Sequence, residues 1–88
     1  MMITEEERFP LQLTVIDIMA QLLSRRPEDI QMEHSLLNDL YLDSLHVLEL
    51  LTLLEQRFGF ETEAEDLQPH VFSTVESVVA FVREKAAS

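Results

Sequence analysis

Glycine and proline are scarce throughout this chain, which contains one glycine and three prolines among 88 residues. A turn-rich all-β fold needs more of both, so the composition argues against one. Apolar residues instead recur at intervals of three and four, the spacing that gathers them on one face of an α-helix. The sequence therefore predicts an all-α fold, and its length predicts one domain with one core.

The chain also lacks features that mark several other classes of protein. It has no cysteine, which excludes disulfides and thiolate zinc sites and gives no sign of an oxidising compartment. No apolar run approaches the roughly 20 residues of a membrane-spanning helix. Residues 1–8 are acidic and hold no apolar segment, unlike a secretory signal. We therefore expect a cytoplasmic protein without a membrane span.

The charge of the chain is strongly negative, because 17 acidic residues outnumber 6 basic ones and give a net charge of −11. The acids are spread along the whole length rather than gathered in a tail. Such a field repels nucleic acid and anionic lipid, and it attracts basic protein surfaces. Solubility alone also accounts for a charge of this size. Nucleic-acid partners are therefore excluded, and basic protein partners are favoured.

The first helix is predicted at residues 10–24. Its apolar stripe consists of Leu11, Val15, Ile18, Met19 and Leu22. Pro10 suits the first helical position, where its missing N–H is no loss, and Pro27 prevents continuation. An earlier start, with residues 4–7 as a capping box, would place Pro10 inside the helix and kink it. Residues 1–9 are therefore expected to be a mobile N-terminal extension, ahead of a domain at 10–85.

The second long helix is predicted at residues 44–58, after a loop in which Ser35 caps a short turn. Asp43 is the expected N-cap, because a short side-chain acceptor is favoured there. Gly59 is expected to end the helix, since glycine adopts the left-handed conformation of a helix C-terminus without strain.

Two capping boxes predict the remaining helices. Residues 62–65 are expected to open one short helix that ends near Pro69, and residues 73–76 to open a last helix that reaches Lys85. The residues of the last helix that face inward are Val75, Val78, Val79, Phe81 and Val82. A strand is the alternative here, because β-branched residues are indifferent helix formers. The capping box and the spacing favour a bundle of three long helices and one short helix.

Ser44 is a candidate site for covalent modification. A serine in the first turn of a helix, just after a long loop, is exposed and within reach of a modifying enzyme. A phosphodiester on its hydroxyl would lie near unpaired N–H groups and the positive end of the helix dipole. The alternative is that Asp43 and Ser44 only begin a helix, since both residue types are common there.

The sequence around Ser44 resembles that of acyl carrier proteins, over roughly residues 10–85. The resemblance rests on Asp29-Ile30, Ser35-Leu36, Asp39-Leu40, Asp43-Ser44-Leu45, Val47-Leu48-Glu49-Leu50, Leu54-Glu55, Phe58-Gly59 and Phe72-Ser73-Thr74-Val75. It implies that a phosphopantetheinyl transferase attaches 4′-phosphopantetheine from coenzyme A to Ser44, beside the capping Asp43. It also implies a monomeric, non-enzymatic carrier of acyl thioesters, which serves acyl-transferring or condensing enzymes of a fatty-acid-like, polyketide or related pathway.

The chain departs from the family pattern at several places. Tyr41 stands where the family usually has glycine, and Thr62-Glu63 replaces an apolar residue followed by proline. The second helix is also less acidic than usual. These departures indicate a specialised carrier rather than one that serves bulk fatty-acid synthesis.

In the acyl carrier proteins that this chain resembles, the outer face of the second helix docks partner enzymes. At about 100° per residue, the outward residues are Leu45, Glu49, Thr52, Leu53 and Gln56, with His46 at the margin. Two leucines beside the attachment site predict a largely apolar docking patch. Glu49 is the acid expected to fix the register of the partner.

Other functions stay open as alternatives. The chain could be an acidic helical adaptor that binds a basic partner non-covalently, or a carrier of aminoacyl or peptidyl cargo. The histidines His34, His46 and His70 lack the spacing of a metal site or catalytic base. The acids Glu61, Glu63, Glu65 and Asp66 lack the spacing of a calcium loop and are interpreted as a solvated face. No metal is therefore expected.

Overall fold

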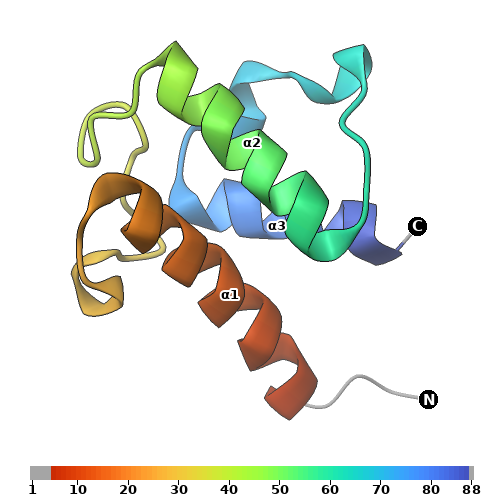
Figure 1. Ribbon diagram of the computed structural model, residues 1–88, viewed down its shortest axis with the longest axis horizontal. Helices are drawn as coiled ribbons and strands as arrows, with labels where there is room; N and C mark the ends of the chain where they lie inside the picture. The colour runs from red at the N-terminus through yellow and green to blue at the C-terminus, as the bar shows by residue number, and fades with distance from the viewer. Residues whose placement is uncertain (1–4, 88) are drawn as a thin grey trace.

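The computed structural model describes residues 5–87 and contains three α-helices that contact one another pairwise (Figure 1). The helices are α1 (Glu5–Leu23), α2 (Ser44–Phe58) and α3 (Val75–Ala87). Short 3-10 turns interrupt the connections, namely η1 (Pro27–Asp29), η2 (Ala64–Asp66) and η3 (Pro69–Phe72). Within residues 5–87 the only strand-like pairing is a bridge between Ser35 and Thr74. The all-α prediction is confirmed, whereas the single short helix is replaced by separate 3-10 turns.

The start of α1 differs from the prediction, because the helix begins at Glu5 rather than at Pro10. The helix therefore includes residues 5–9, which the sequence placed in the N-terminal extension. Pro10 then lies in the second turn, where it has no backbone N–H to donate. Residues 1–4, part of the expected extension, lie outside the described residues, as does the start of the alternative capping box.

A single apolar core joins the three helices. Fully buried side chains come from α1 (Val15 and Met19), from α2 (Leu50 and Leu54) and from α3. All five α3 residues that the periodicity predicts to face inward are buried, which confirms the helical interpretation: Val75, Val78, Val79, Phe81 and Val82. The ring of Phe81 meets Phe60 and Phe72 edge-on, with centroids 5.9 Å and 6.1 Å away. These aromatic contacts pack the connection between α2 and α3 (residues 59–74) against α3.

The loop before α2 is held by its own capping turn. The Ser35 Oγ accepts the Asn38 N–H at 3.1 Å, and the Ser35 N–H donates to Asp39 Oδ2 at 2.7 Å. The predicted capping role of Ser35 is therefore confirmed. The loop is also fastened to the start of α3, because the Leu36 N–H donates to the Ser73 carbonyl at 3.1 Å. These bonds fix the segment that leads into α2.

The predicted cap at Thr62 is wrong by one residue. Glu63 is the N-cap of η2, and its N–H donates to Asp66 Oδ2 at 2.9 Å. Thr62 is instead tied backward to α2, since its N–H donates to Glu55 Oε2 at 2.7 Å. The Glu55 side chain thus holds the beginning of the connection between α2 and α3 against α2.

The predicted cap at Ser73 is also one residue early. Thr74 and Ser77 form the reciprocal box that begins α3, with N–H to Oγ distances of 3.0 Å and 3.1 Å. The Ser73 hydroxyl is used elsewhere, because it donates to the His70 carbonyl at 3.0 Å. Ser73 therefore belongs to the end of η3 rather than to the start of α3.

Within residues 5–87, three residues have positive φ, and one of them is glycine. Gly59 ends α2 at φ 71°, and the Phe60 N–H bonds the Glu55 carbonyl at 3.3 Å, as in a Schellman motif. Ser24 ends α1 at φ 55°. Tyr41 has φ 59° just before α2, so it adopts the conformation that glycine adopts without strain. The departure of Tyr41 from the family pattern therefore strains the backbone.

Burial explains why the strain at Tyr41 persists. Leu40 and Leu42 on either side are both 2 % exposed, and burying a leucine side chain contributes about 1.5–3 kcal/mol. A left-handed residue with a Cβ costs about 1–2 kcal/mol. The two buried leucines therefore outweigh the strain and hold the backbone of Tyr41 in place.

We expect opposite stability changes at the two left-handed positions. Tyr41→Gly should raise the free energy of unfolding by about 0.5–1 kcal/mol, since relief of strain exceeds the added freedom of the unfolded chain. Gly59→Ala should lower it by about 1 kcal/mol through the backbone alone, because an added Cβ there meets nothing within 4 Å. Urea denaturation measures both, and shifts of the same sign would contradict the assignment.

Salt is expected to stabilise the fold. Repulsions outnumber attractions on a chain with 17 acidic and 6 basic residues. Raising NaCl from about 0.01 M to about 1 M shortens the screening length from about 30 Å to about 3 Å. The thermal midpoint should therefore rise with NaCl, and a midpoint that falls or stays level would show that repulsion does not limit stability.

Candidate functional site

Ser44 is exposed at the first position of α2, a helix of 15 residues. Among residues 5–87, none is hydrogen-bonded to its hydroxyl. Asp43 is the N-cap as predicted, with an extended backbone (φ −94°, ψ −177°), and its Oδ1 accepts the His46 N–H at 2.8 Å. The cap therefore satisfies one helical N–H group and leaves the Ser44 hydroxyl accessible.

The carboxylate of Asp43 carries a full negative charge at neutral pH. The His46 N–H lowers the pKa of Asp43 below its ordinary value, and the nearby His46 ring also lowers it. The ring Nδ1 lies 3.2 Å from Asp43 Oδ1. Because the folded pKa is lower than the unfolded one, the cap stabilises the fold above the unfolded pKa. This contribution is lost as the pH falls through the folded pKa.

The start of α2 fits a phosphodiester on Ser44. The hydroxyl is exposed and makes no hydrogen bond within the described chain, so modification breaks no contact there. The first-turn N–H groups and the helix dipole favour an added negative charge. The Asp43 carboxylate opposes it at short range, but that group already accepts the His46 N–H. The net environment suits a solvent-facing phosphate.

The predicted docking residues lie on the outer side of α2 in the positions that the helical geometry gives. Leu45, Glu49, Thr52, Leu53 and Gln56 are exposed, whereas His46 is half-buried and faces Asp43. Leu48 was missed by the sequence analysis, although it is 58 % exposed. Around the helix axis, Leu48 lies about 70° to one side of the direction that points away from the core, and Leu53 lies about as far to the other side. The periodicity alone could have found it.

Two shallow depressions meet at Leu53. One lies along α2 and is lined by Leu48, Glu49, Thr52 and Leu53. The other lies at the seam with α1 and is lined by Ile18, Gln21, Leu53, Gln56 and Arg57. Leu53 is 39 % exposed, so it contributes to the surface and also packs at the seam. Leu53 therefore connects the two depressions.

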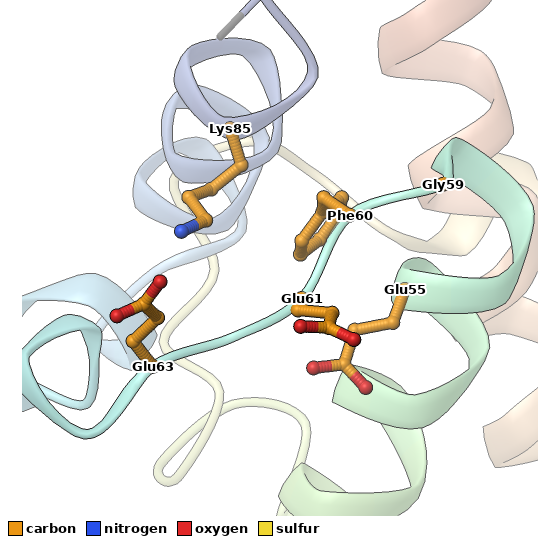
Figure 2. A pocket seen from close by; sticks show the side chains of 6 residues that line it. All are labelled: Glu55, Gly59, Phe60, Glu61, Glu63 and Lys85. Atoms are coloured by element: carbon orange, nitrogen blue, oxygen red, sulfur yellow. The ribbon is translucent and has the colours of Figure 1, made fainter.

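The opposite end of α2 borders an acidic pocket. Figure 2 shows its lining residues, which are Glu55, Gly59, Phe60, Glu61, Glu63 and Lys85. Lys85 also pairs with Asp66 at 2.8 Å, and this hydrogen bond lowers the pKa of Asp66 and raises that of Lys85. The end of α2 is about 22 Å from Ser44 along the helix. The pocket is therefore separate from the Ser44 site.

No metal centre emerges from the residues that the structure describes. Within them, no group of three or more histidine, aspartate or glutamate side chains is arranged to hold an ion. His34 is used locally, since its Nδ1 accepts the Gln31 N–H at 3.0 Å. His70 is exposed beside η3. The three histidines therefore form no common site in residues 5–87.

A small helical domain with a free serine at the start of its second helix has the arrangement of a carrier domain. Residues 13–82 match the protein family described as "Phosphopantetheine attachment site". The chain is 34 % identical to the acyl carrier protein of Chlamydia trachomatis over 77 % of its length and 86 % of the relative. It is 41 % identical to that of Coprothermobacter proteolyticus, over 75 % and 78 %. The chain belongs to the acyl carrier protein family.

Solved structures of carriers share the fold. The holo acyl carrier protein of Nitrosomonas europaea superposes with a TM-score of 0.74 at 28 % identity, covering 88 % of this chain and 96 % of that one. An apo doublet acyl carrier protein from prodigiosin biosynthesis gives 0.79 at 23 % identity, covering 96 % and 40 %. As a family member the chain is a non-catalytic carrier with covalently attached phosphopantetheine. No helix in residues 5–87 is long and apolar enough to cross a membrane.

Proposed function

We propose that Ser44 is the attachment site of phosphopantetheine in this carrier. The observation that carries the proposal is its exposed hydroxyl, which no described residue binds, at the positive end of α2. When bound, the arm supplies a thiol that holds acyl groups as thioesters. Asp43 keeps the helix start in place beside it.

Loading transfers the phosphopantetheinyl group of coenzyme A to the Ser44 hydroxyl. Its Oγ forms a bond to the phosphorus of coenzyme A that bears pantetheine, and the pyrophosphate P–O bond breaks. Adenosine 3′,5′-bisphosphate leaves, and the hydroxyl proton passes to a base of the transferase. The carrier contributes an accessible hydroxyl and a helix end that tolerates the product's charge.

The partners in this proposal are acyl-transferring or condensing enzymes of a fatty-acid-like, polyketide or related pathway. The exposed leucines and single acid on the outer face of α2 support an apolar docking patch for them. The net charge of −11 supports steering by basic surfaces. The strained Tyr41 and the Glu63 cap at η2 support a specialised carrier.

The direct test is incubation with coenzyme A and a broad-specificity phosphopantetheinyl transferase, followed by intact-mass spectrometry. The chain should gain the mass of one phosphopantetheine and no more. A chain that several active transferases leave unmodified would contradict the proposal, provided that each one modifies a known carrier in the same buffer.

A further inference from the structure

Tyr41 presents an aromatic ring on a fixed backbone three residues before Ser44. The residue is 73 % exposed, although its neighbours Leu40 and Leu42 are 2 % exposed. Both neighbouring N–H groups are hydrogen-bonded to carbonyls of the preceding turn, at 3.1 Å and 2.9 Å. The backbone cannot rotate to bury the ring without releasing these contacts. An aromatic side chain on a fixed backbone loses little conformational entropy when a partner covers it.

Further exposed apolar side chains follow at the start of α2. Leu45 is 63 % exposed and Leu48 is 58 % exposed, and residues three apart lie together on one helix face. Single exposed leucines are ordinary on protein surfaces. An aromatic ring and two leucines that bracket a modifiable hydroxyl instead indicate a contact surface, which we define as the Tyr41 patch (Tyr41, Leu45 and Leu48).

The charges around the Tyr41 patch indicate what covers it. Asp39, Asp43 and Glu49 are exposed between and beside its members. The pKa of Asp43 is lowered by the His46 N–H, so this acid is ionised when a partner arrives. A complementary surface therefore has an apolar pocket for the ring and basic side chains at the rim.

The position of the patch selects one class of partner. An enzyme that modifies the Ser44 hydroxyl must bring its reacting groups to that atom and so must cover the adjoining residues. Enzymes that act at the far end of an attached arm can dock farther along α2, around Leu53, without covering Tyr41. We propose that Tyr41 is a specificity-determining anchor that enters an apolar, basic-rimmed pocket of the phosphopantetheinyl transferase. This inference rests on Ser44 as the attachment site.

The test compares four variants in the loading reaction with the phosphopantetheinyl transferase of the source organism. Tyr41→Gly and Tyr41→Asn remove the ring, and both residues tolerate the left-handed backbone. Tyr41→Phe retains the ring without its hydroxyl. Leu13→Ala is the matched control, because Leu13 is a 54 % exposed leucine on α1 rather than on α2 or the loop before it. The readouts are kcat/KM for loading, helicity and the thermal midpoint.

Loss of the ring should lower kcat/KM by at least about tenfold, as removal of an interface anchor does. The loss for Tyr41→Phe should stay below about threefold, and Leu13→Ala should match the wild type. Tyr41→Gly should melt no lower than the wild type, which separates recognition from unfolding. Rates within about twofold for the Gly and Asn variants would overturn the anchor. Equal losses for Phe and Gly would overturn the apolar pocket.

The two proposals fail in distinguishable ways. If the wild-type chain is loaded at another residue or not at all, the assignment of Ser44 fails and the anchor fails with it. If the wild type is loaded at Ser44 and the ring variants load equally fast, only the anchor is wrong.

Discussion

Ser44→Ala is expected to abolish phosphopantetheine attachment completely, because the substitution removes the oxygen that becomes bonded to phosphorus. The fold should be nearly unaffected, since the Ser44 side chain is exposed and no described residue is hydrogen-bonded to its hydroxyl. The helix start is capped by Asp43, which the substitution leaves in place. Intact-mass spectrometry of the transferase reaction should therefore show one mass for the variant and a shifted mass for the wild type.

Ser24→Gly is the matched control for this experiment. Ser24 is another exposed serine at a helix end, and its φ of 55° suits glycine. Its loss should leave loading unchanged. Modification of Ser44→Ala, or loss of modification in Ser24→Gly with an intact fold, would show that another residue holds the arm. Peptide mapping of the loaded wild type would then identify that residue.

The sequence predicted α2 closely because its signals are local. Asp43 and Gly59 define its ends through a side-chain acceptor and a left-handed C-terminus, and the structure has both. Neither feature depends on residues distant in sequence. The Ser44 end of the site could therefore be placed before any tertiary structure was known.

The two capping errors arose where neighbouring residues can both act as the N-cap. Thr62 and Ser73 are both plausible caps, but each is hydrogen-bonded backward, to Glu55 and to His70. The neighbouring Glu63 and Thr74 cap instead. Which of two neighbouring residues acts as the N-cap depends on how the connection packs against α2 and η3. A local capping pattern in the sequence does not contain that information.

The conformation of Tyr41 could not be obtained from its residue type. A bulky residue rarely adopts positive φ, so the sequence favours an extended backbone there. The observed φ of 59° follows from burial of the leucines on both sides, which is a tertiary effect. The family pattern was the available signal, since glycine is usual at this position.

Leu53→Asp, on the outer face of α2, is expected to have a large effect on the transfer of cargo to a partner enzyme. Leu53 joins two shallow depressions and lies about 13 Å along the helix from Ser44. A charge at this point places an unpaired carboxylate in an apolar contact, so transfer of cargo to an acyl-transferring or condensing enzyme should fall by at least about tenfold. Loading of Ser44 should change little, because the transferase needs to cover only the start of the helix.

Glu49→Lys should weaken the same transfer moderately, since it removes the acid on this face without disturbing its leucines. Leu13→Asp is the matched control, because it places the same charge on an exposed leucine of α1. Leu53 is 39 % exposed and packs partly at the α1 seam, so helicity and the thermal midpoint must be measured alongside kcat/KM. If Leu53→Asp remains folded and loaded and its cargo is transferred at the wild-type rate, the docking surface lies elsewhere on the carrier.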